Sequence, residues 1–402
     1  MDISNLGARW VEVDLDVIKH NYEQIRELVP RPVKMLGVVK ADAYGHGAVE
    51  VARVLEKLGI DMLGVTTAEE GKELREAGVT APILVFGPFL KEDVNTIIDY
   101  CLTATIGNRE SVRWLQDGLA QRGGTVKVHL KVETGMGRTG FWPRDALQVI
   151  SEISAVSGLY LEGIYSHLAT AMWKNKRYAQ EQYTIFKNVL DNLARENINI
   201  PIKHLANSAA VLDLPHMQLD MVRVGTLLYG QYPAPELEKK IKLKDPWSLK
   251  AKVIYLRNLP AGHSVGYGRT YKARRETKVA ILPLGFVDGL QMEPVQKPAN
   301  ILDLLKGIAK LVLHYLGHPL VSQPVIFPGG RGRIIGKVGM QLSMVDVTTL
   351  KGIEVGTVAT VPARRTAIRP TLPVVYREEG RVKSFKVTSA AIWEKETAVK
   401  EQ

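Results

Sequence analysis

Short apolar runs alternate with amphipathic stretches over most of the first 245 residues. Where apolar residues lie three and four positions apart, as within 175–199, the pattern predicts helices, and glycines at 59, 78, 124 and 158 follow where such helices should end. The apolar runs between them predict buried strands. These runs are Met35–Val39, Met62–Val65, Ile83–Phe86, Leu102–Ile106, Val126–Val132, Leu161–His167, Ile202–Ala206 and Met221–Val224.

Eight strands that alternate with helices fit a closed (β/α)8 barrel better than an open, doubly wound sheet. An open sheet of that kind normally has a glycine-rich dinucleotide loop after its first strand, and the sequence has none. We therefore expect an α/β chain whose N-terminal part, residues 11–245, is a (β/α)8 barrel.

The pattern changes after Tyr229-Gly230. Pro233, Pro235 and the charged run 236–244 read as a linker, and from Ala251 onward apolar and polar residues alternate with period two. This alternation predicts strands at Lys252–Leu256, Thr277–Leu282, Ile334–Val338, Met344–Val347 and Thr357–Val361. We expect a smaller, mostly-β C-terminal domain over residues 246–402, with residues 1–10 associated with it and the segment near Trp10–Asp14 as a further candidate to join it.

Residues 291–324 read as a helical insertion in this β domain. Asn300 can cap a helix whose apolar residues share one face. We expect that face to pack on the body of the protein or on a partner subunit, rather than on a membrane surface with the help of Lys306 and Lys310. The face comprises Ile301, Leu304, Leu305, Ile308, Leu311, Val312 and Tyr315.

The composition narrows the class of protein. A net charge of +11 could suggest nucleic-acid binding, but basic and acidic residues alternate and no aromatic-basic motif is present, so a basic surface that attracts small anions is favoured. The single cysteine, Cys101, argues against a disulfide framework and a cysteine-rich metal site. No apolar run is long enough to span a membrane, and the first residues lack a signal-peptide pattern. We expect a cytoplasmic protein that binds neither nucleic acid nor membrane and needs no metal.

Polar residues follow several of the predicted strands, where a barrel enzyme has its chemistry. Lys40 directly follows the first strand, and a buried amine there can act as a nucleophile or a base. A lysine that extends from a strand end into solvent would explain Lys40 alone equally well. The other strand-end residues are Tyr44, Lys131, Glu133, Arg138, His167, Asn207, Ser208, Arg223, Gly225 and Thr226.

Four segments together resemble the alanine racemase family, the barrel-type racemases that use pyridoxal 5'-phosphate. They are Val-Lys-Ala-Asp-Ala-Tyr-Gly-His-Gly at 39–47, Thr-Gly-Met-Gly-Arg at 134–138, Ala-Asn-Ser-Ala-Ala at 206–210 and Met-Val-Arg-Val-Gly at 221–225. The resemblance runs from about Arg9 to Thr349 and is interrupted by the insertion.

The resemblance implies that Lys40 carries the cofactor through a Schiff base and is one of two acid/base groups. It implies that Arg223 faces the pyridine nitrogen, that Arg138 binds the substrate carboxylate, and that Lys131 occupies a position that is often carbamylated. Since an arginine does not readily give up its proton, we interpret Arg223 as weakening the electron sink of the cofactor. The remaining implied cofactor contacts are Tyr44, His167, Asn207, Ser208, Gly225 and Thr226, with a phosphate cup made by Tyr44, Ser208 and the backbone around Gly225 and Thr226.

The second base is implied in the β domain. From its sequence Val-Gly-Tyr-Gly-Arg-Thr-Tyr at 265–271 alone, Tyr267 reads as a turn residue. The resemblance instead puts it opposite Lys40 across the cofactor, contributed by the partner subunit of a homodimer. Racemisation needs bases on the two faces of a planar intermediate, and Lys40 and Tyr267 meet that need.

The chain departs from the family pattern around the substrate. Met340, whose backbone amide could bind a carboxylate, is followed by Gln341 where an aspartate is usual. Phe286 stands in place of a tyrosine, Met172 in place of an aspartate, and the late tyrosine that contacts the phosphate has no clear counterpart. Alanine racemisation is our first prediction. The alternatives are a racemase for another amino acid, a barrel-type pyridoxal-phosphate decarboxylase and a non-catalytic carrier of the cofactor.

Overall fold

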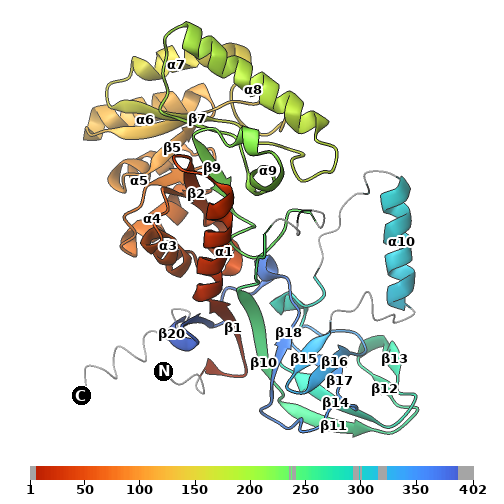
Figure 1. The fold of residues 1–402 in the computed structure, drawn as a ribbon. Helices are drawn as coiled ribbons and strands as arrows, with labels where there is room; N and C mark the ends of the chain where they lie inside the picture. The colour runs from red at the N-terminus through yellow and green to blue at the C-terminus, as the bar shows by residue number, and fades with distance from the viewer. Residues whose placement is uncertain are drawn as a thin grey trace, which may run out of the picture. The chain divides into compact units, whose positions relative to one another are not determined.

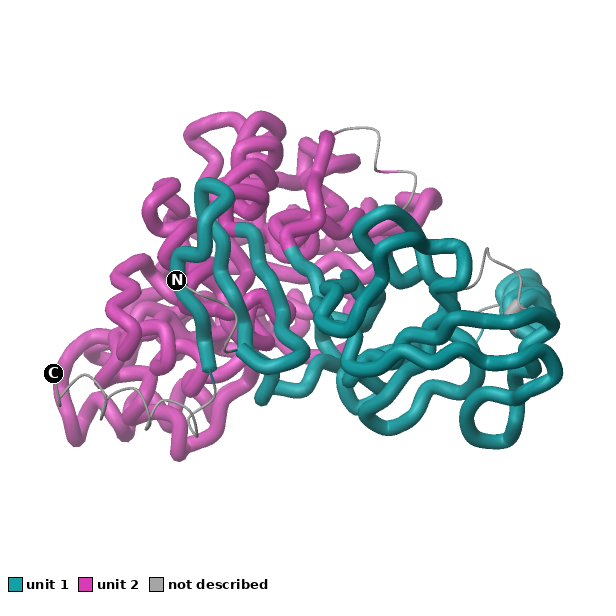
Figure 2. The backbone as a smooth tube through the Cα atoms, turned by 90° about the horizontal axis from the view of Figure 1, so that it is seen from below, with its two compact units in different colours: residues 1–14, 247–402 teal, residues 15–246 magenta. Residues whose placement is uncertain are grey.

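The computed structural model describes residues 6–234, 237, 241–292, 298, 301–315 and 324–387. It divides into two compact units, residues 15–246 and residues 1–14 with 247–402, which Figure 2 colours magenta and teal. The predicted cap Asn300 and parts of the linker and of the insertion lie outside the described residues.

Residues 15–246 form a closed barrel of parallel strands, with helices between successive strands (Figure 1). The last strand pairs with the first, with Lys34 opposite Met221 and Gly37 opposite Val224, which closes the ring. The strands are β2 (Lys34–Val38), β3 (Met62–Val65), β4 (Ile83–Val85), β5 (Thr103–Ile106), β6 (Val126–Lys131), β7 (Leu159–Tyr165), β8 (Ile202–His204) and β9 (Met221–Val224). The predicted barrel and its eight strands are confirmed, with differences of one or two residues at half of the strand ends.

Apart from α2 and α9, the helices of this unit bury an apolar face and expose a polar one. Capping side chains explain where two of them begin: Thr67 accepts a hydrogen bond from the amide of Glu70, and Asn108 accepts one from the amide of Ser111. The helices are α1 (Leu15–Leu28), α2 (Lys40–Gly45), α3 (Ala48–Lys57), α4 (Ala68–Glu76), α5 (Val94–Asp99), α6 (Arg109–Arg122), α7 (Ala146–Ser154), α8 (Arg177–Arg195) and α9 (Ser208–Asp213). Short 3-10 turns lie at Lys91–Asp93, Pro143–Asp145 and Pro215–Met217.

Apolar side chains from several strands fill part of the barrel interior. Leu36, Val38, Met62, Leu84, Ile202 and Met221 form one buried cluster, against which Tyr44 and Phe86 pack. A packed apolar core of this kind is expected of a closed barrel of eight strands.

The other unit contains a ten-stranded mixed sheet and a two-stranded hairpin. Along the sheet the order is β11-β14-β17-β16-β15-β18-β10-β1-β19-β20. Its strands are β1 (Arg9–Asp14), β10 (Trp247–Lys252), β11 (Tyr255–Leu259), β14 (Thr277–Leu282), β15 (Val325–Phe327), β16 (Gly330–Ile334), β17 (Ser343–Asp346), β18 (Val358–Val361), β19 (Val374–Glu378) and β20 (Arg381–Lys386). The hairpin is β12 (Ser264–Val265) with β13 (Tyr271–Lys272), and 3-10 turns lie at Tyr267–Arg269, Phe286–Asp288 and Arg365–Ala367.

Two strand predictions in this unit are wrong. The segment Lys252–Leu256 spans the break between β10 and β11, and Ile334–Val338 lies almost wholly beyond the end of β16. Both are apolar runs in connections, which alternation cannot distinguish from strands. At the N-terminus, β1 pairs with β10 and β19, so residues 11–14, which we had assigned to the barrel domain, belong to this sheet.

The insertion contains α10 (Ile301–Tyr315). Its apolar face is exposed, from 43% for Leu304 to 90% for Tyr315. The expectation that this face packs on the body of the chain is therefore not met among the described residues.

No helix among the described residues is both long and apolar enough to cross a bilayer. Nor does the described part of the chain gather three or more metal-ligating side chains into one group.

Candidate active site

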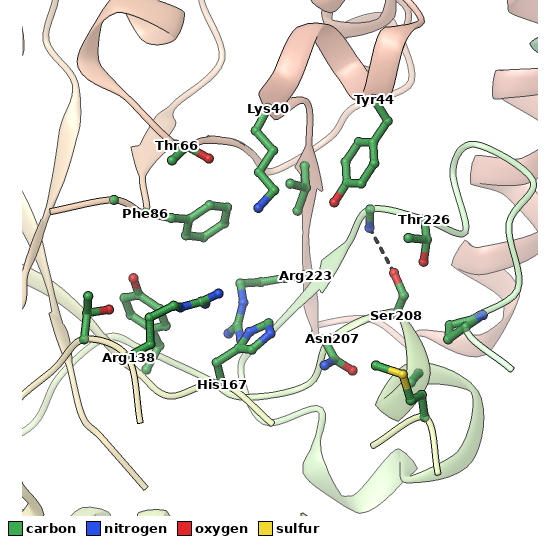
Figure 3. Close-up of a pocket in the computed structure, with 18 of the residues that line it drawn as sticks. Lys40, Tyr44, Thr66, Phe86, Arg138, His167, Asn207, Ser208, Arg223 and Thr226 are labelled. Carbon is green, nitrogen blue, oxygen red and sulfur yellow. Dashed lines mark hydrogen bonds between the residues drawn. The ribbon is translucent and has the colours of Figure 1, made fainter. Parts of the chain in front are cut away.

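A cavity of about 680 Å³ opens among the strand ends of the barrel, and all its lining residues belong to residues 15–246. This volume suits a cofactor or a small ligand. Figure 3 shows the Lys40 amine in this cavity, with Tyr44, Arg138 and Arg223 around it. The cavity brings together ten of the predicted site residues: Lys40, Tyr44, Lys131, Arg138, His167, Asn207, Ser208, Arg223, Gly225 and Thr226.

Lys40 begins an unusual turn. The next four residues, Ala41 to Tyr44, all have φ between 51° and 56°, which is the left-handed region. This conformation costs roughly 1–2 kcal/mol for each residue that is not glycine. Hydrogen bonds hold the turn from outside: Glu70 of α4 accepts from the amide of Ala41 at 2.6 Å, and Asp42 accepts from the amide of Ala48 at 2.8 Å. The strained turn thus connects Lys40 at the end of β2 to Tyr44 in the same cavity.

A narrow cradle lies between Tyr44, Ser208 and Gly225. The Gly225 amide donates a hydrogen bond to Ser208 Oγ at 3.0 Å. A Cβ at Gly225 would lie 2.7 Å from Tyr44 Oη, so only glycine allows this approach. Asn207 caps α9 by accepting from the amide of Ala210, and it also donates to the carbonyl of Leu168, so its side chain stabilises the loops around the cradle.

Arg223 is buried, with 4% of its surface exposed, and its guanidinium donates to neutral acceptors. These are the carbonyls of Ser166 and Leu205, at 2.7 and 3.1 Å, and one ring nitrogen each of His204 and His167. Burial lowers the pKa of Arg223 to about 10, which leaves it charged at neutral pH. Among the described residues no carboxylate lies within ion-pair distance of it, so its charge is available to a ligand.

His167 is neutral in this setting. Burial, and then the positive charges of Arg223 and Arg138, lower the pKa of its ring to about 3. Because Arg223 donates to Nδ1 at 3.3 Å, the ring hydrogen is on Nε2. His167 can therefore donate one hydrogen bond from Nε2.

Lys131 and Arg138 lie on the same side of the cavity. The Lys131 ammonium donates to Thr139 Oγ1 at 2.6 Å and is buried. Burial, followed by the positive charges of Arg138 and Arg223, lowers the pKa of Lys131 to about 8. Glu133, which sequence analysis grouped with the strand-end residues, does not line the cavity; its carboxylate accepts from the amides of Gly135, Met136 and Arg138 and so holds the turn that carries Arg138.

Besides Glu133, two predicted residues do not line this cavity. Tyr267 lies on the tip of the β12–β13 hairpin, between Gly266 and Gly268, with 77% of its surface exposed. Met340 lies in a loop and is 61% exposed. Both belong to the other unit.

Several residues that line the cavity were not predicted from the sequence. Phe86 is the last residue of a predicted strand, and Tyr165 lies inside another. The Lys131 ammonium and the Arg223 guanidinium are 5.7 and 5.3 Å from the ring centroid of Tyr165. The position of Phe86 at the end of a predicted strand, and of Thr66 directly after the predicted strand Met62–Val65, was a usable signal. Pro88, Gln231 and Tyr232 lie in connecting segments and offered none.

A closed barrel with a cavity at its strand ends is the usual architecture of a barrel enzyme, and here a separate β unit accompanies it in the same chain. Family models agree with this division. The model for the alanine racemase N-terminal domain matches residues 13–233, and the model for the alanine racemase C-terminal domain matches residues 247–372.

The sequences of named relatives agree as well. The chain is 39% identical to alanine racemase 1 of Caldanaerobacter subterraneus subsp. tengcongensis, over 89% of this chain and 86% of that one. It is 38% identical to alanine racemase of Halothermothrix orenii, over 86% of this chain and 85% of that one.

Solved structures share the whole fold. Alanine racemase of Clostridium difficile 630 aligns with a TM-score of 0.84 and 30% identity, over 94% of this chain and 98% of that one. The structure of alanine racemase from Bacillus anthracis with bound L-Ala-P aligns with a TM-score of 0.81 and 28% identity, over 96% and 98% of the two chains. The chain belongs to the alanine racemase family, and it is an isomerase.

Proposed function

We propose that this protein interconverts L-alanine and D-alanine with pyridoxal 5'-phosphate as its cofactor. The observation that carries the proposal is the convergence of Lys40, Arg223 and the Gly225 cradle in one cavity of a chain from this family. The proposal includes a cytoplasmic location, which the free and exposed Cys101 supports.

The residues present fit this cofactor. The cradle at Gly225 is too narrow for a side chain and offers the hydroxyls of Tyr44 and Ser208. It suits a phosphate group, which accepts hydrogen bonds from such donors without needing a basic residue. Lys40 would hold the aldehyde carbon covalently, and the charged guanidinium of Arg223 would lie against the ring nitrogen. When bound, the cofactor would supply an electron sink that makes the α-hydrogen of the amino acid acidic.

The protein then has to move one proton between two faces of the α-carbon. Lys40 Nζ would accept or return it on one face, and the phenol of Tyr267 on the other. His167, neutral with its hydrogen on Nε2, can donate to a phenolate and so stabilise Tyr267 after it has given up its proton. Arg138 would hold the substrate carboxylate, with the backbone amide of Met340 as a second donor.

Tyr267 would come from a second copy of the chain in a homodimer. All residues that line the cavity belong to the barrel unit, while Tyr267 lies exposed at the tip of a hairpin in the other unit. A two-base mechanism needs both groups at one carbon, so an arrangement in which each chain supplies Tyr267 to its partner completes both sites.

Lys131 would be carbamylated. Its amine would attack CO2, forming an N–C bond and releasing a proton, and the resulting carboxylate would turn repulsion of Arg138 into attraction. A pKa near 8 supports this, because only the neutral amine reacts.

Incubation of the purified protein and cofactor with L-alanine in heavy water tests the function. We expect D-alanine to form with deuterium at the α-carbon, as read by chiral chromatography and mass spectrometry. No inversion of L-alanine, with cofactor demonstrably bound to Lys40, would contradict the proposal.

A second candidate is a racemase for a larger uncharged amino acid. It is favoured by Met172, which lines the cavity and stands where the family pattern has an aspartate, and by Phe86, another apolar residue of the lining. The same assay run with larger amino acids in parallel distinguishes the two, because alanine should have the highest kcat/KM under the first proposal.

A further inference from the structure

A line of polar side chains runs through the barrel away from the cavity. Arg223 donates to His204 Nδ1 at 3.0 Å, His204 Nε2 lies 2.8 Å from His129 Nδ1, and His129 Nε2 lies 3.3 Å from Glu162 Oε2. Lys127 donates to the other carboxylate oxygen of Glu162 at 2.6 Å. The first four residues are buried, whereas about half of the Lys127 side chain is exposed. The line therefore connects the cavity to solvent elsewhere on the barrel.

The ends of this line fix the position of every ring hydrogen. A guanidinium can only donate, so His204 Nδ1 must accept. Burial, and then the charge of Arg223, lowers the pKa of His204 well below its ordinary value, and burial lowers that of His129, so both rings are neutral. His204 must then donate from Nε2 to His129 Nδ1, and His129 must donate from Nε2 to Glu162. A carboxylate can only accept, so one set of tautomers satisfies all three contacts.

The fold makes specific provision for this arrangement. Val128 of β6 pairs with Leu161 and His129 pairs with Gly163, so Glu162 is the extra residue of a β-bulge. Bulges re-aim a side chain, and here the bulge lets Glu162 reach His129. The next residue must be glycine, because a Cβ at Gly163 would lie 2.6 Å from the His129 ring.

The opposite charges of Arg223 and Glu162, at the two ends of the pair of histidines, also favour this set of tautomers. Burial alone would raise the pKa of Glu162, but the hydrogen bonds from His129 and Lys127 outweigh burial and lower it to about 2. Glu162 is thus ionised at neutral pH. The Tyr165 ring stacks on the His204 ring, with 4.7 Å between the ring centroids and 17° between the ring planes, and this stacking limits the rotation of the His204 ring.

We propose that Glu162 is a positioning residue for Arg223. Glu162 fixes His129 as a donor, His129 fixes His204, and His204 then presents a lone pair to the guanidinium. Without the carboxylate, both rings can adopt the other tautomer, and His204 would direct an N–H at the N–H of Arg223. Arg223 would move, and with it the hydrogen bond that it donates to His167. The effect on turnover rests on the proposed function, whereas the tautomers do not.

The tautomers can be observed directly. In protein labelled with ¹⁵N-histidine, the chemical shifts of the two ring nitrogens identify the tautomer, and variants that remove single histidines assign the signals. We expect His129 and His204 of the unaltered holoenzyme to be neutral and to carry their hydrogens on Nε2. A hydrogen on Nδ1 of either ring, or a protonated ring at neutral pH, would overturn the proposal without any change at Glu162.

Two variants at Glu162 then test the cause. Glu162→Gln removes the charge and adds a donor, so we expect mixed tautomers and a fall in kcat on the order of tenfold, as for outer-shell carboxylates that orient histidines at metal sites. KM for alanine should change little, because Arg138 holds the substrate. Glu162→Asp keeps the carboxylate and should restore both the tautomers and most of the turnover.

Glu152→Gln is the matched control. It removes a carboxylate that pairs with Arg109 at 3.1 Å outside the line, and it should leave tautomers and turnover unchanged. If Glu162→Gln keeps single tautomers and full kcat, Glu162 does not position Arg223. If the tautomers change as expected but the unaltered protein racemises no amino acid, the positioning role stands and the proposed function fails.

Discussion

The barrel cavity and the Tyr267 hairpin differ in how firmly the surrounding chain holds their functional groups. Arg223 is 4% exposed and donates to four acceptors, and the turn after Lys40 is held by Glu70 and Asp42. Tyr267 is 77% exposed at a hairpin tip. The groups that would hold a cofactor are thus fixed within one unit, whereas the group that would supply the second proton is exposed to solvent.

This difference predicts which of the two units cofactor binding and racemisation each depend on. A residue that must reach into a preformed cavity from another chain has to be exposed until the chains associate. Cofactor binding should therefore depend on the barrel unit alone, and racemisation on both units. Each of the variants below changes a residue either of the barrel unit or of the hairpin.

The largest effect is expected on the barrel side. Lys40→Ala removes both the covalent anchor and one base, so racemisation should fall by about 10⁴-fold or more. The visible absorbance of lysine-bound cofactor should disappear with it. Lys203→Ala, at a partly exposed lysine of β8 that pairs with Asp220, is the control and should leave both unchanged. If Lys40→Ala retained activity, Lys40 would be neither the covalent anchor nor a base, and the proposed site would be wrong.

On the hairpin side, Tyr267→Phe should keep the bound cofactor but reduce racemisation by roughly 10²- to 10⁴-fold. Mixing this variant with Lys40→Ala under conditions that exchange subunits tests sharing. Each mixed dimer has one site with both native groups, so about a quarter of the native activity should return. If the mixture stays inactive although mixed dimers form, Tyr267 does not act across subunits.

A smaller effect is expected at the cradle. Gly225→Ala puts a Cβ 2.7 Å from Tyr44 Oη, so Tyr44 must move and cofactor affinity should fall on the order of tenfold. Equilibrium titration with the cofactor measures this. Gly107→Ala, whose Cβ would meet only the Gly140 amide at 3.7 Å, is the matched control. Unchanged affinity in Gly225→Ala would mean that the phosphate lies elsewhere.

The charge on Lys131 predicts a pH dependence. Because burial and the neighbouring arginines hold its pKa near 8, the neutral amine becomes more abundant as the pH rises through 8. With ¹³C-bicarbonate, a carbamate signal in the ¹³C spectrum should be present at pH 9 and strongly reduced at pH 6.5. Lys131→Ala should lack it at both values. A signal in the native protein that does not change with pH would contradict the low pKa.

Much of the barrel could be predicted from the sequence because its strands are buried on both sides and read as uninterrupted apolar runs. Ten site residues could be assigned to one rim of the barrel, because the carboxyl ends of the strands of a parallel barrel lie at the same rim. In the β unit, alternation was a weaker guide, since Val253 and Ile254 continue an apolar pattern across the break between β10 and β11.

Other features had no signal in the sequence. Glu133 has the position of a site residue, yet its carboxylate is used by backbone amides, which only the loop geometry determines. The positioning role proposed for Glu162 depends on a one-residue bulge in the strand, and apolar periodicity does not reveal bulges. For α10, the amphipathic pattern predicted the helix but could not say what its apolar face meets.

The left-handed turn after Lys40 reverses the usual rules of substitution over four positions. A mutational scan of α3 should favour alanine and leucine, whereas at Ala41 it should favour glycine and asparagine and disfavour valine most. Ala41→Gly should raise the free energy of unfolding by about 1 kcal/mol, as measured by denaturant titration. A chain made by chemical synthesis should even accept a D-residue there, because the backbone at this one place has the handedness of the mirror-image polypeptide.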